Sequence, residues 1–155
     1  MRRLLDLFCG AGGCTAGYQR AGFYVVGVDI NPQPNYCGDA FVQADALEVL
    51  REWHFNTFDA IHASPPCQAY SAGGSMPGAR DGHPDLIAET RSLLRATGRP
   101  YVIENVEGAP LHSPVRLCGT GLGLGADGHD LARHRLFETS FPLDLVPPCG
   151  CGGRP

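Results

Sequence analysis

The 155 residues of this chain suffice for one domain, and 43% hydrophobic with 18% charged residues excludes an intrinsically disordered protein. A net charge of −4 argues against strong, sequence-independent binding of nucleic acid over the whole surface. No apolar run approaches the roughly 20 residues of a membrane helix, so we expect no membrane partner. The seven cysteines follow no export signal, which indicates reduced thiols and a cytoplasmic protein.

Short apolar runs alternate with helical stretches along the chain, which is typical of a mostly parallel sheet with helices on both faces. Strands are predicted at residues 4–8, 24–29, 41–43, 60–63 and 101–103, with later strands at 115–118 and 136–139. Helices are predicted at 15–21, 46–53 and 85–97. Residues 69–84 carry four Gly and two Pro without apolar periodicity, which predicts a lid or substrate loop. We therefore predict an α/β, Rossmann-like, doubly wound fold.

Polar and glycine residues follow the first three predicted strands. The turn Gly10-Ala11-Gly12-Gly13 lets the backbone approach a nucleoside, although alone it is equally typical of a tight structural turn. Asp29 ends the second strand and can accept both hydroxyls of a ribose, and Asp45, after the third strand, can accept from an adenine amino group. Each aspartate taken singly is more typical of a helix cap or a turn. Their order at successive strand ends favours a nucleoside cofactor site.

Cys67 follows the fourth strand in the segment Ser64-Pro65-Pro66-Cys67-Gln68-Ala69-Tyr70-Ser71. Two prolines restrict the backbone just ahead of the thiol, at the sheet edge where open α/β sheets place their chemistry. The alternative is a buried, unreactive cysteine beside a Pro-Pro turn. The segment alone leaves both interpretations open.

Four segments together carry a resemblance to a known family: residues 6–13, Pro65-Pro66-Cys67-Gln68 with Ser71, Glu104-Asn105-Val106, and Arg133-His134-Arg135. In this order they resemble the motifs of the cytosine-C5 DNA methyltransferases, most closely the small phage-type members. The resemblance implies the fold of the S-adenosylmethionine-dependent methyltransferases, that cofactor with S-adenosylhomocysteine as product, and DNA with a flipped cytosine as partner. It also implies a bacterial or phage-infected host cell.

The resemblance implies three groups of site residues. The catalytic group is Cys67, Glu104, Asn105, Arg133 and Arg135. The cofactor-binding group is Asp6, Phe8, Cys9, Gly10, Ala11, Gly12, Gly13, Asp29, Ile30, Asp45, Ala46 and Pro65. The substrate-binding group is Pro66, Gln68, Ser71 and Arg80.

The chemistry of cytosine explains the catalytic group. C5 is a poor nucleophile, so a soft thiolate from Cys67 is expected to add to C6 first. Cysteine is mostly protonated at neutral pH, so a nearby cation, Arg135, is expected to favour the thiolate. Glu104 is expected to hydrogen-bond N3 and the exocyclic amine, and Asn105 to hold the active-site backbone.

The chain departs from the family pattern near its end. Only 20 residues follow Arg135, where the family carries a target-recognition segment, and Leu131 stands where the family usually has Gln. We therefore expect a catalytic domain at 1–141 and a Pro/Cys/Gly-rich tail at 142–155 that can begin a recognition segment, with a partner chain or a further segment supplying the rest. After Arg135 the side chains available to base edges are Glu138, Asp144, Cys149, Cys151 and Arg154. Cys149 and Cys151 could contribute to a zinc site, but no matching second pair follows, and no metal is expected.

Other functions are open from the sequence. The same cysteine and Glu-Asn-Val chemistry serves RNA cytosine methyltransferases, and a catalytically silent cofactor- or DNA-binding subunit would suit the short length and the negative charge. The intact Cys67 and Glu104 oppose the silent subunit. A thiol hydrolase lacks a histidine in recognisable relation to Cys67, and a dinucleotide oxidoreductase lacks the usual G-x-G-x-x-G turn.

Overall fold

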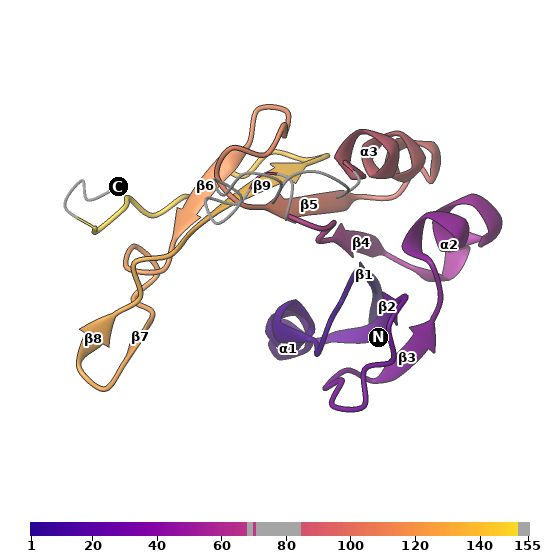
Figure 1. Ribbon diagram of the computed structural model, residues 1–155, viewed down its shortest axis with the longest axis horizontal. Helices are drawn as coiled ribbons and strands as arrows, with labels where there is room; N and C mark the ends of the chain where they lie inside the picture. Colours follow the sequence, from indigo (N-terminus) through magenta and orange to yellow (C-terminus); the bar gives the residue numbers. More distant parts are fainter. Residues whose placement is uncertain (68–69, 71–84, 152–155) are drawn as a thin grey trace, which may run out of the picture.

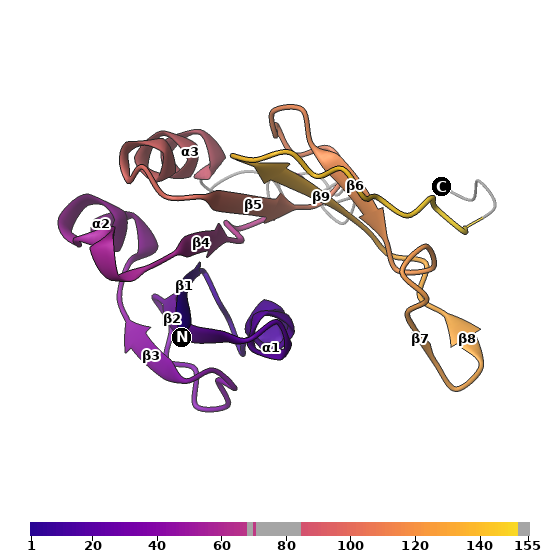
Figure 2. The same ribbon diagram turned by 180° about the vertical axis from the view of Figure 1, so that it is seen from behind.

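The computed structural model describes residues 1–67, 70 and 85–151, and is built on a seven-stranded sheet with helices on both faces (Figures 1 and 2). The elements are, in chain order, β1 (Arg2–Leu7), α1 (Gly13–Arg20), β2 (Phe23–Asp29), β3 (Ala40–Gln43), α2 (Ala46–Glu52), the short 3-10 helix η1 (Phe55–Thr57), β4 (Ala60–Ala63), α3 (Ile87–Ala96), β5 (Tyr101–Asn105), β6 (Val115–Cys118), β7 (Gly125–Ala126), β8 (His129–Asp130) and β9 (His134–Thr139). The predicted α/β, doubly wound architecture is confirmed. Within the described residues, no helix has the length and apolar character needed to cross a membrane.

The strand order of the sheet is β3-β2-β1-β4-β5-β9-β6. The pairs from β3 to β5 are parallel, whereas β9 pairs antiparallel with both β5 and β6. From β1 the chain adds β2 and β3 toward one edge of the sheet, and it then returns to add β4 and β5 on the other side of β1. The strand order therefore reverses between β1 and β4. Open α/β sheets bind ligands at such a switch point, outside the carboxyl ends of the strands.

The helices cover both faces because the crossovers between parallel strands are right-handed. The β1-α1-β2 connection runs toward one edge of the sheet, and the connections through α2 and α3 run toward the other. Accordingly α1 lies on one face, and α2 and α3 lie side by side on the opposite face (Figures 1 and 2).

The central strands are buried on both faces, which explains their nearly continuous apolar sequence. In β1, Leu4, Leu5 and Leu7 are at most 1% exposed. The core between the sheet and the α2–α3 layer also contains Val49, Ile61 and other apolar side chains, including Leu50, Phe55, Phe58, Leu94 and Ile103. Burial of these strands fixes the sheet, so that the loops after their carboxyl ends are free to form a site.

A buried ion pair joins α3 to the antiparallel strand β9. Arg91 donates from Nε to Glu138 Oε1 at 2.7 Å and from Nη2 to Glu138 Oε2 at 2.8 Å. Glu138 also accepts from the His112 backbone N–H at 2.8 Å. Burial alone raises the pKa of Glu138, but the bonds from Arg91 and His112 outweigh it and lower the pKa below its ordinary value. The sequence analysis included Glu138 among the side chains available to base edges. This prediction is wrong, because its carboxylate is buried and both oxygens accept hydrogen bonds from Arg91 and His112.

Candidate active site

A pocket of about 660 Å³ lies at the carboxyl edge of the sheet, over the switch point. Each parallel strand contributes residues at or just after its carboxyl end. Strand β9 runs antiparallel, so that its first residues reach the same edge. The lining residues are Phe8, Asp29, Ile30, Asn31, Asp45, Ala46, Leu47, Ser64, Pro65, Pro66, Cys67, Leu86, Glu104, Asn105, Val106, Arg133 and Arg135. All five predicted catalytic residues thus share one pocket with Asp29 and Asp45.

Asp29 ties the end of β2 to the turn that follows β1. Its Oδ2 accepts from the Gly10 backbone N–H at 3.0 Å, and its Oδ1 accepts from the Asn31 N–H at 2.9 Å. Phe8 begins the turn with a φ of 58°, a left-handed conformation that costs free energy for a residue with a side chain. The turn is therefore held in a fixed, strained shape at the pocket wall.

The aspartate after β3 caps helix α2. Asp45 Oδ1 accepts from the Leu47 N–H at 2.7 Å and from the Glu48 N–H at 3.1 Å. This is the capping role that the sequence weighed as the alternative to a ligand contact. Asp45 nevertheless lines the pocket, so its carboxylate both caps the helix and borders the space beside Asp29.

The prolines after β4 present Cys67 to the pocket on a braced turn. The Ser64 N–H donates to Leu7 O at 3.1 Å, which extends the β1–β4 pairing into the turn. Asn105, buried at the end of β5, donates from Nδ2 to Pro65 O at 2.9 Å. Cys67 is half-buried on this turn and faces the pocket, which does not fit the alternative of an unreactive core cysteine.

A buried histidine supports the same turn from behind. His62, in β4, lies 2.8 Å from Ser64 Oγ through Nε2 and 3.0 Å from Tyr18 Oη through Nδ1. Burial lowers the pKa of His62 to about 4, so the ring is neutral at physiological pH. The sequence analysis gave His62 no role, because a lone histidine in an apolar strand carries no site signal.

Opposite the turn, Glu104 of β5 pairs with Arg135 of β9. Arg135 Nε lies 2.8 Å from Glu104 Oε1, and Arg135 Nη1 donates to His134 O at 2.8 Å. The sequence placed Arg135 beside the Cys67 thiolate, whereas the structure pairs its guanidinium with the Glu104 carboxylate. Antiparallel β9 brings the two side chains together, and a single sequence does not reveal that pairing.

Several predicted cofactor residues do not line the pocket: Asp6, Cys9, Gly10, Ala11, Gly12 and Gly13. Asp6 is 1% exposed and accepts from Thr15 Oγ1 at 2.5 Å, and burial raises its pKa to about 6. At Gly12, with φ 93°, a Cβ would lie 2.8 Å from Cys37 Sγ. Buried Asp6 and Gly12 therefore support the turn after β1 without lining the pocket, whereas Ala11 and Gly13 are exposed.

The pocket also contains residues to which the sequence analysis gave no role in the site: Asn31, Leu47, Ser64, Leu86 and Val106. Four of them are immediate neighbours in the chain of a predicted site residue, and that proximity is the signal that could have found them. Leu86 comes instead from the start of α3 and could not be placed without the fold. The predicted substrate-binding residues Gln68, Ser71 and Arg80, most of the predicted lid at 69–84, and Arg154 lie outside the described residues.

Comparison with known proteins identifies the family. The sequence model of the C-5 cytosine-specific DNA methylase family matches residues 2–114, and the chain belongs to this family. Among the relatives, Type II methyltransferase M.AplI of Arthrospira platensis is 32% identical over 116 residues, covering 68% of this chain and 31% of the relative. Type II methyltransferase M.HgiCI of Herpetosiphon aurantiacus is 29% identical over 158 residues, covering 94% of this chain and 34% of the relative. The chain thus spans about a third of the length of these relatives.

Solved structures agree with the fold. The Dnmt2 methyltransferase of S. pombe aligns with a TM-score of 0.61 at 17% identity, covering 94% of this chain and 51% of that one. A SAM-dependent methyltransferase of Archaeoglobus fulgidus aligns with a TM-score of 0.50 at 24% identity, covering 71% and 47%. The sheet described here is therefore that of the S-adenosylmethionine-dependent methyltransferases. The family description names DNA, which does not favour the RNA alternative.

Proposed function

We propose that this chain is the catalytic core of a DNA (cytosine-5)-methyltransferase that uses S-adenosylmethionine and attacks a flipped cytosine through Cys67. The observation that carries the proposal is the single pocket in which Cys67 and Glu104 meet the carboxylates Asp29 and Asp45. A thiol and an acid–base group at one end, with nucleoside-binding side chains at the other, suit methyl transfer between two bound molecules.

The cofactor half of the pocket fits S-adenosylmethionine. Ile30 lies beside Asp29, is 62% exposed and offers apolar surface to a purine ring. The Asp29 oxygens each accept one backbone N–H, and a carboxylate oxygen has a further lone pair for a ribose hydroxyl. The cofactor, when bound, supplies an electrophilic methyl group. The carboxyl-end position of both residues matches nucleotide sites on this class of sheet.

Cys67 is the proposed nucleophile. Its thiolate adds to C6 of cytosine, the new S–C bond forms, and the ring π electrons move toward C5. C5 can then take a methyl group. Loss of the C5 proton to a base returns the electron pair to the ring, and the S–C6 bond breaks to release Cys67. The prolines and the Asn105–Pro65 bond hold the sulfur in place, so little entropy is lost when it attacks.

Glu104 is the proposed acid–base partner of the base ring. It lies across the pocket on β5, where a carboxyl group can hydrogen-bond N3 and the exocyclic amine as negative charge develops on the ring. The ion pair with Arg135 fixes the orientation of Glu104. Arg133, exposed at the pocket rim, is placed to contact a phosphate.

The test is covalent trapping on a DNA duplex that contains 5-fluorocytosine. Fluorine at C5 cannot leave as a proton does, so the enzyme stays bonded to C6 after methyl transfer. With S-adenosylmethionine and a pool of random-sequence duplexes, we expect an adduct that survives denaturing electrophoresis. Cys67→Ala should form none, and Glu52→Gln, at an exposed residue outside the pocket, should form as much as the parent chain.

Two results would contradict the proposal. One is an adduct in Cys67→Ala equal to that of the parent. The other is tight binding of S-adenosylhomocysteine and DNA with no adduct on any duplex, which is the behaviour expected of a silent binding subunit.

A further inference from the structure

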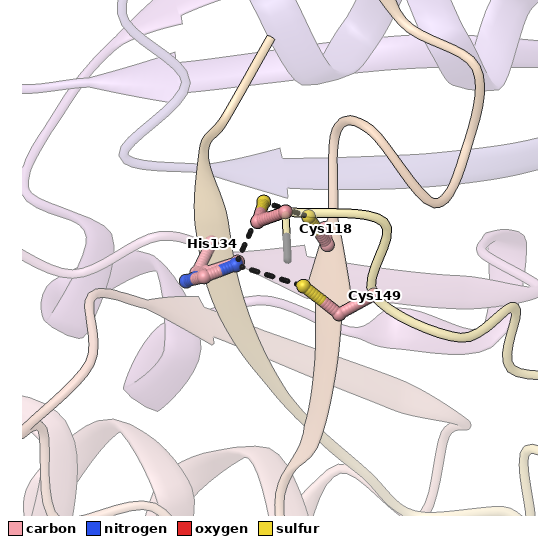
Figure 3. A group of neighbouring side chains, drawn as sticks. Cys118, His134 and Cys149 are labelled. Atoms are coloured by element: carbon pink, nitrogen blue, oxygen red, sulfur yellow. Dashed lines mark hydrogen bonds between the residues drawn. The ribbon is translucent and has the colours of Figure 1, made fainter. Parts of the chain in front are cut away.

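Four potential metal ligands meet at the β6–β9 edge of the sheet, outside the lining of the candidate active site. Cys118 ends β6 and His134 begins β9, and the two are directly opposite each other in the antiparallel pair. Cys149 and Cys151 come from the tail. The ligand atoms of all four lie within 4.8 Å of one another. Figure 3 shows Cys118, His134 and Cys149 of this group pointing toward one another. None of the four lines the pocket that contains Cys67.

The separations suit a tetrahedral centre. Cys149 Sγ lies 3.4 Å and Cys151 Sγ lies 3.5 Å from His134 Nε2, and Cys118 Sγ lies 3.1 Å from Cys151 Sγ. With Zn–S distances of about 2.3 Å and Zn–N distances of about 2.0 Å, ligand atoms around zinc are roughly 3.5–4 Å apart. A small outward adjustment of the thiols therefore makes room for one ion.

The histidine is oriented as metal-bound histidines usually are. Its other ring nitrogen, Nδ1, lies 3.1 Å from Glu107 Oε2. A carboxylate in this position accepts the Nδ1 proton and leaves a lone pair on Nε2, which faces the thiols. Imidazole plus three cysteines is a typical donor set of structural zinc sites.

The surrounding backbone packs tightly, as it does around structural metal sites. A Cβ on Gly121 would lie 2.3 Å from Pro148 O, so only glycine lets the tail approach the turn after β6. A Cβ on Gly150, between the two tail cysteines, would lie 3.3 Å from Thr120 Oγ1. The Gly121 N–H and the Thr120 hydroxyl also hydrogen-bond Cys118 Sγ. Such contacts to the sulfur are the outer-shell bonds that orient metal ligands.

We propose that Cys118, His134, Cys149 and Cys151 bind one Zn²⁺ ion as a structural site that anchors the tail to the β6–β9 edge of the sheet. All four coordination positions are filled by protein, so no position is open for catalysis. The site closes a loop that contains the β7–β8 hairpin, which projects away from the sheet (Figure 1). It also holds the tail against the end of β6, which is the edge strand of the sheet.

The sequence analysis considered Cys149 and Cys151 as zinc ligands but expected no metal, because Cys118 and His134 are far from the tail pair and from each other along the chain. Only the pairing of β6 with β9 makes Cys118 and His134 neighbours. The competing explanation of the close sulfurs is a Cys118–Cys151 disulfide. The observed 3.1 Å exceeds the roughly 2.05 Å of an S–S bond, and both cysteines are free in the structure.

The experiment measures metal content of the untagged chain, purified with a thiol reductant and without chelator, by plasma mass spectrometry. We expect one zinc per chain. Replacement by Co²⁺ should give the strong visible bands of tetrahedral thiolate coordination, a readout independent of methyl transfer. Cys149→Ser and His134→Ala should lose most of the zinc under mild competition by a chelator. Cys37→Ser, at an exposed cysteine outside the cluster, should retain it.

Glu107→Gln is the variant that keeps all four ligands, and Glu107 is exposed, so the fold should be unaffected. We expect zinc affinity to fall about 10–100-fold, in line with other outer-shell carboxylates. The proposal is overturned if the parent chain holds no zinc after reduction and incubation with excess Zn²⁺, or if Cys149→Ser and His134→Ala hold as much as the parent. An intact mass two hydrogens below that of the reduced chain, mapped to Cys118–Cys151, would also overturn it.

Discussion

Glu104 and Arg135 form an ion pair that joins β5 to β9 at the mouth of the pocket, with Nε and Oε1 2.8 Å apart. The two side chains are about one fifth and one third exposed, so the pair is only partly screened by water. Because the guanidinium holds one carboxylate oxygen, Oε2 keeps its lone pairs for a bound base. The antiparallel strand therefore contributes to the site by orienting a group that belongs to the parallel sheet.

Replacing Glu104 by Gln should separate chemistry from binding. The amide retains the shape but cannot exchange a proton with N3, so we expect methyl transfer to slow by about 10²–10⁴-fold. The affinity for S-adenosylhomocysteine, measured by calorimetry, should stay within a few-fold. Glu52→Gln, exposed at the end of α2, is the matched control and should behave like the parent. Methyl transfer by Glu104→Gln at the parental rate would remove Glu104 from the mechanism.

Asp29 should control cofactor affinity. Its removal takes away a charged acceptor for ribose and leaves the Gly10 and Asn31 N–H groups without their partner. We expect Asp29→Ala to weaken S-adenosylhomocysteine binding by about 1.5–3 kcal/mol, and Asp29→Asn to weaken it less, since an amide oxygen still accepts. Calorimetry of these variants, with exposed Asp130→Asn as control, makes the measurement. Unchanged affinity in Asp29→Ala would show that the nucleoside binds elsewhere.

His62 should make stability depend on pH. Burial lowers its pKa from 6.5 to about 4, so the unfolded chain binds a proton below pH 6.5 that the folded chain takes up only near pH 4. The contribution of neutral His62 to the free energy of unfolding is therefore fully present above pH 6.5. It falls by up to about 3 kcal/mol as the pH drops from 6.5 through about 4. Urea denaturation of His62→Gln should show a flatter profile between pH 6.5 and 4. A parallel profile in His62→Gln and in exposed His54→Gln would contradict the assignment.

Removing one partner of the Arg91–Glu138 pair should destabilise the fold strongly, whereas replacing both partners by apolar residues should destabilise it little. Glu138→Gln leaves a buried guanidinium without its counter-charge, and we expect a loss of about 3–5 kcal/mol in the free energy of unfolding. The pKa of Glu138 is lowered in the folded chain, so the ion pair stabilises the parent fully at pH values above the ordinary pKa of a glutamate. This stabilisation is lost as the pH falls through the lowered pKa of the folded state. The double variant Arg91→Met/Glu138→Leu should be much closer to the parent. Thermal and urea denaturation measure both, and equal destabilisation of the single and double variants would contradict this account.

Local sequence patterns were sufficient for most of the secondary structure. Strands at 60–63 and 115–118 were predicted with their observed bounds, and the helix predicted at 85–97 is α3, Ile87–Ala96. Gly98, with φ 66°, follows it as expected of a helix stop. Such predictions succeed because apolar periodicity and Gly or Pro breaks report burial and backbone freedom residue by residue. The short strands β7 and β8 were missed, since two exposed residues each leave no periodic signal.

The sequence by itself also determined the family motifs and which chemical groups stand at the strand ends, because parallel strands bring their carboxyl ends to one edge regardless of sheet details. The tertiary structure alone decided what those groups contact. Strand β9 lies antiparallel between β5 and β6. This position pairs Arg135 with Glu104 and buries Glu138 against Arg91. It also places His134 opposite Cys118. Pairings between strands distant in the chain depend on long-range packing, which no local pattern of residues encodes.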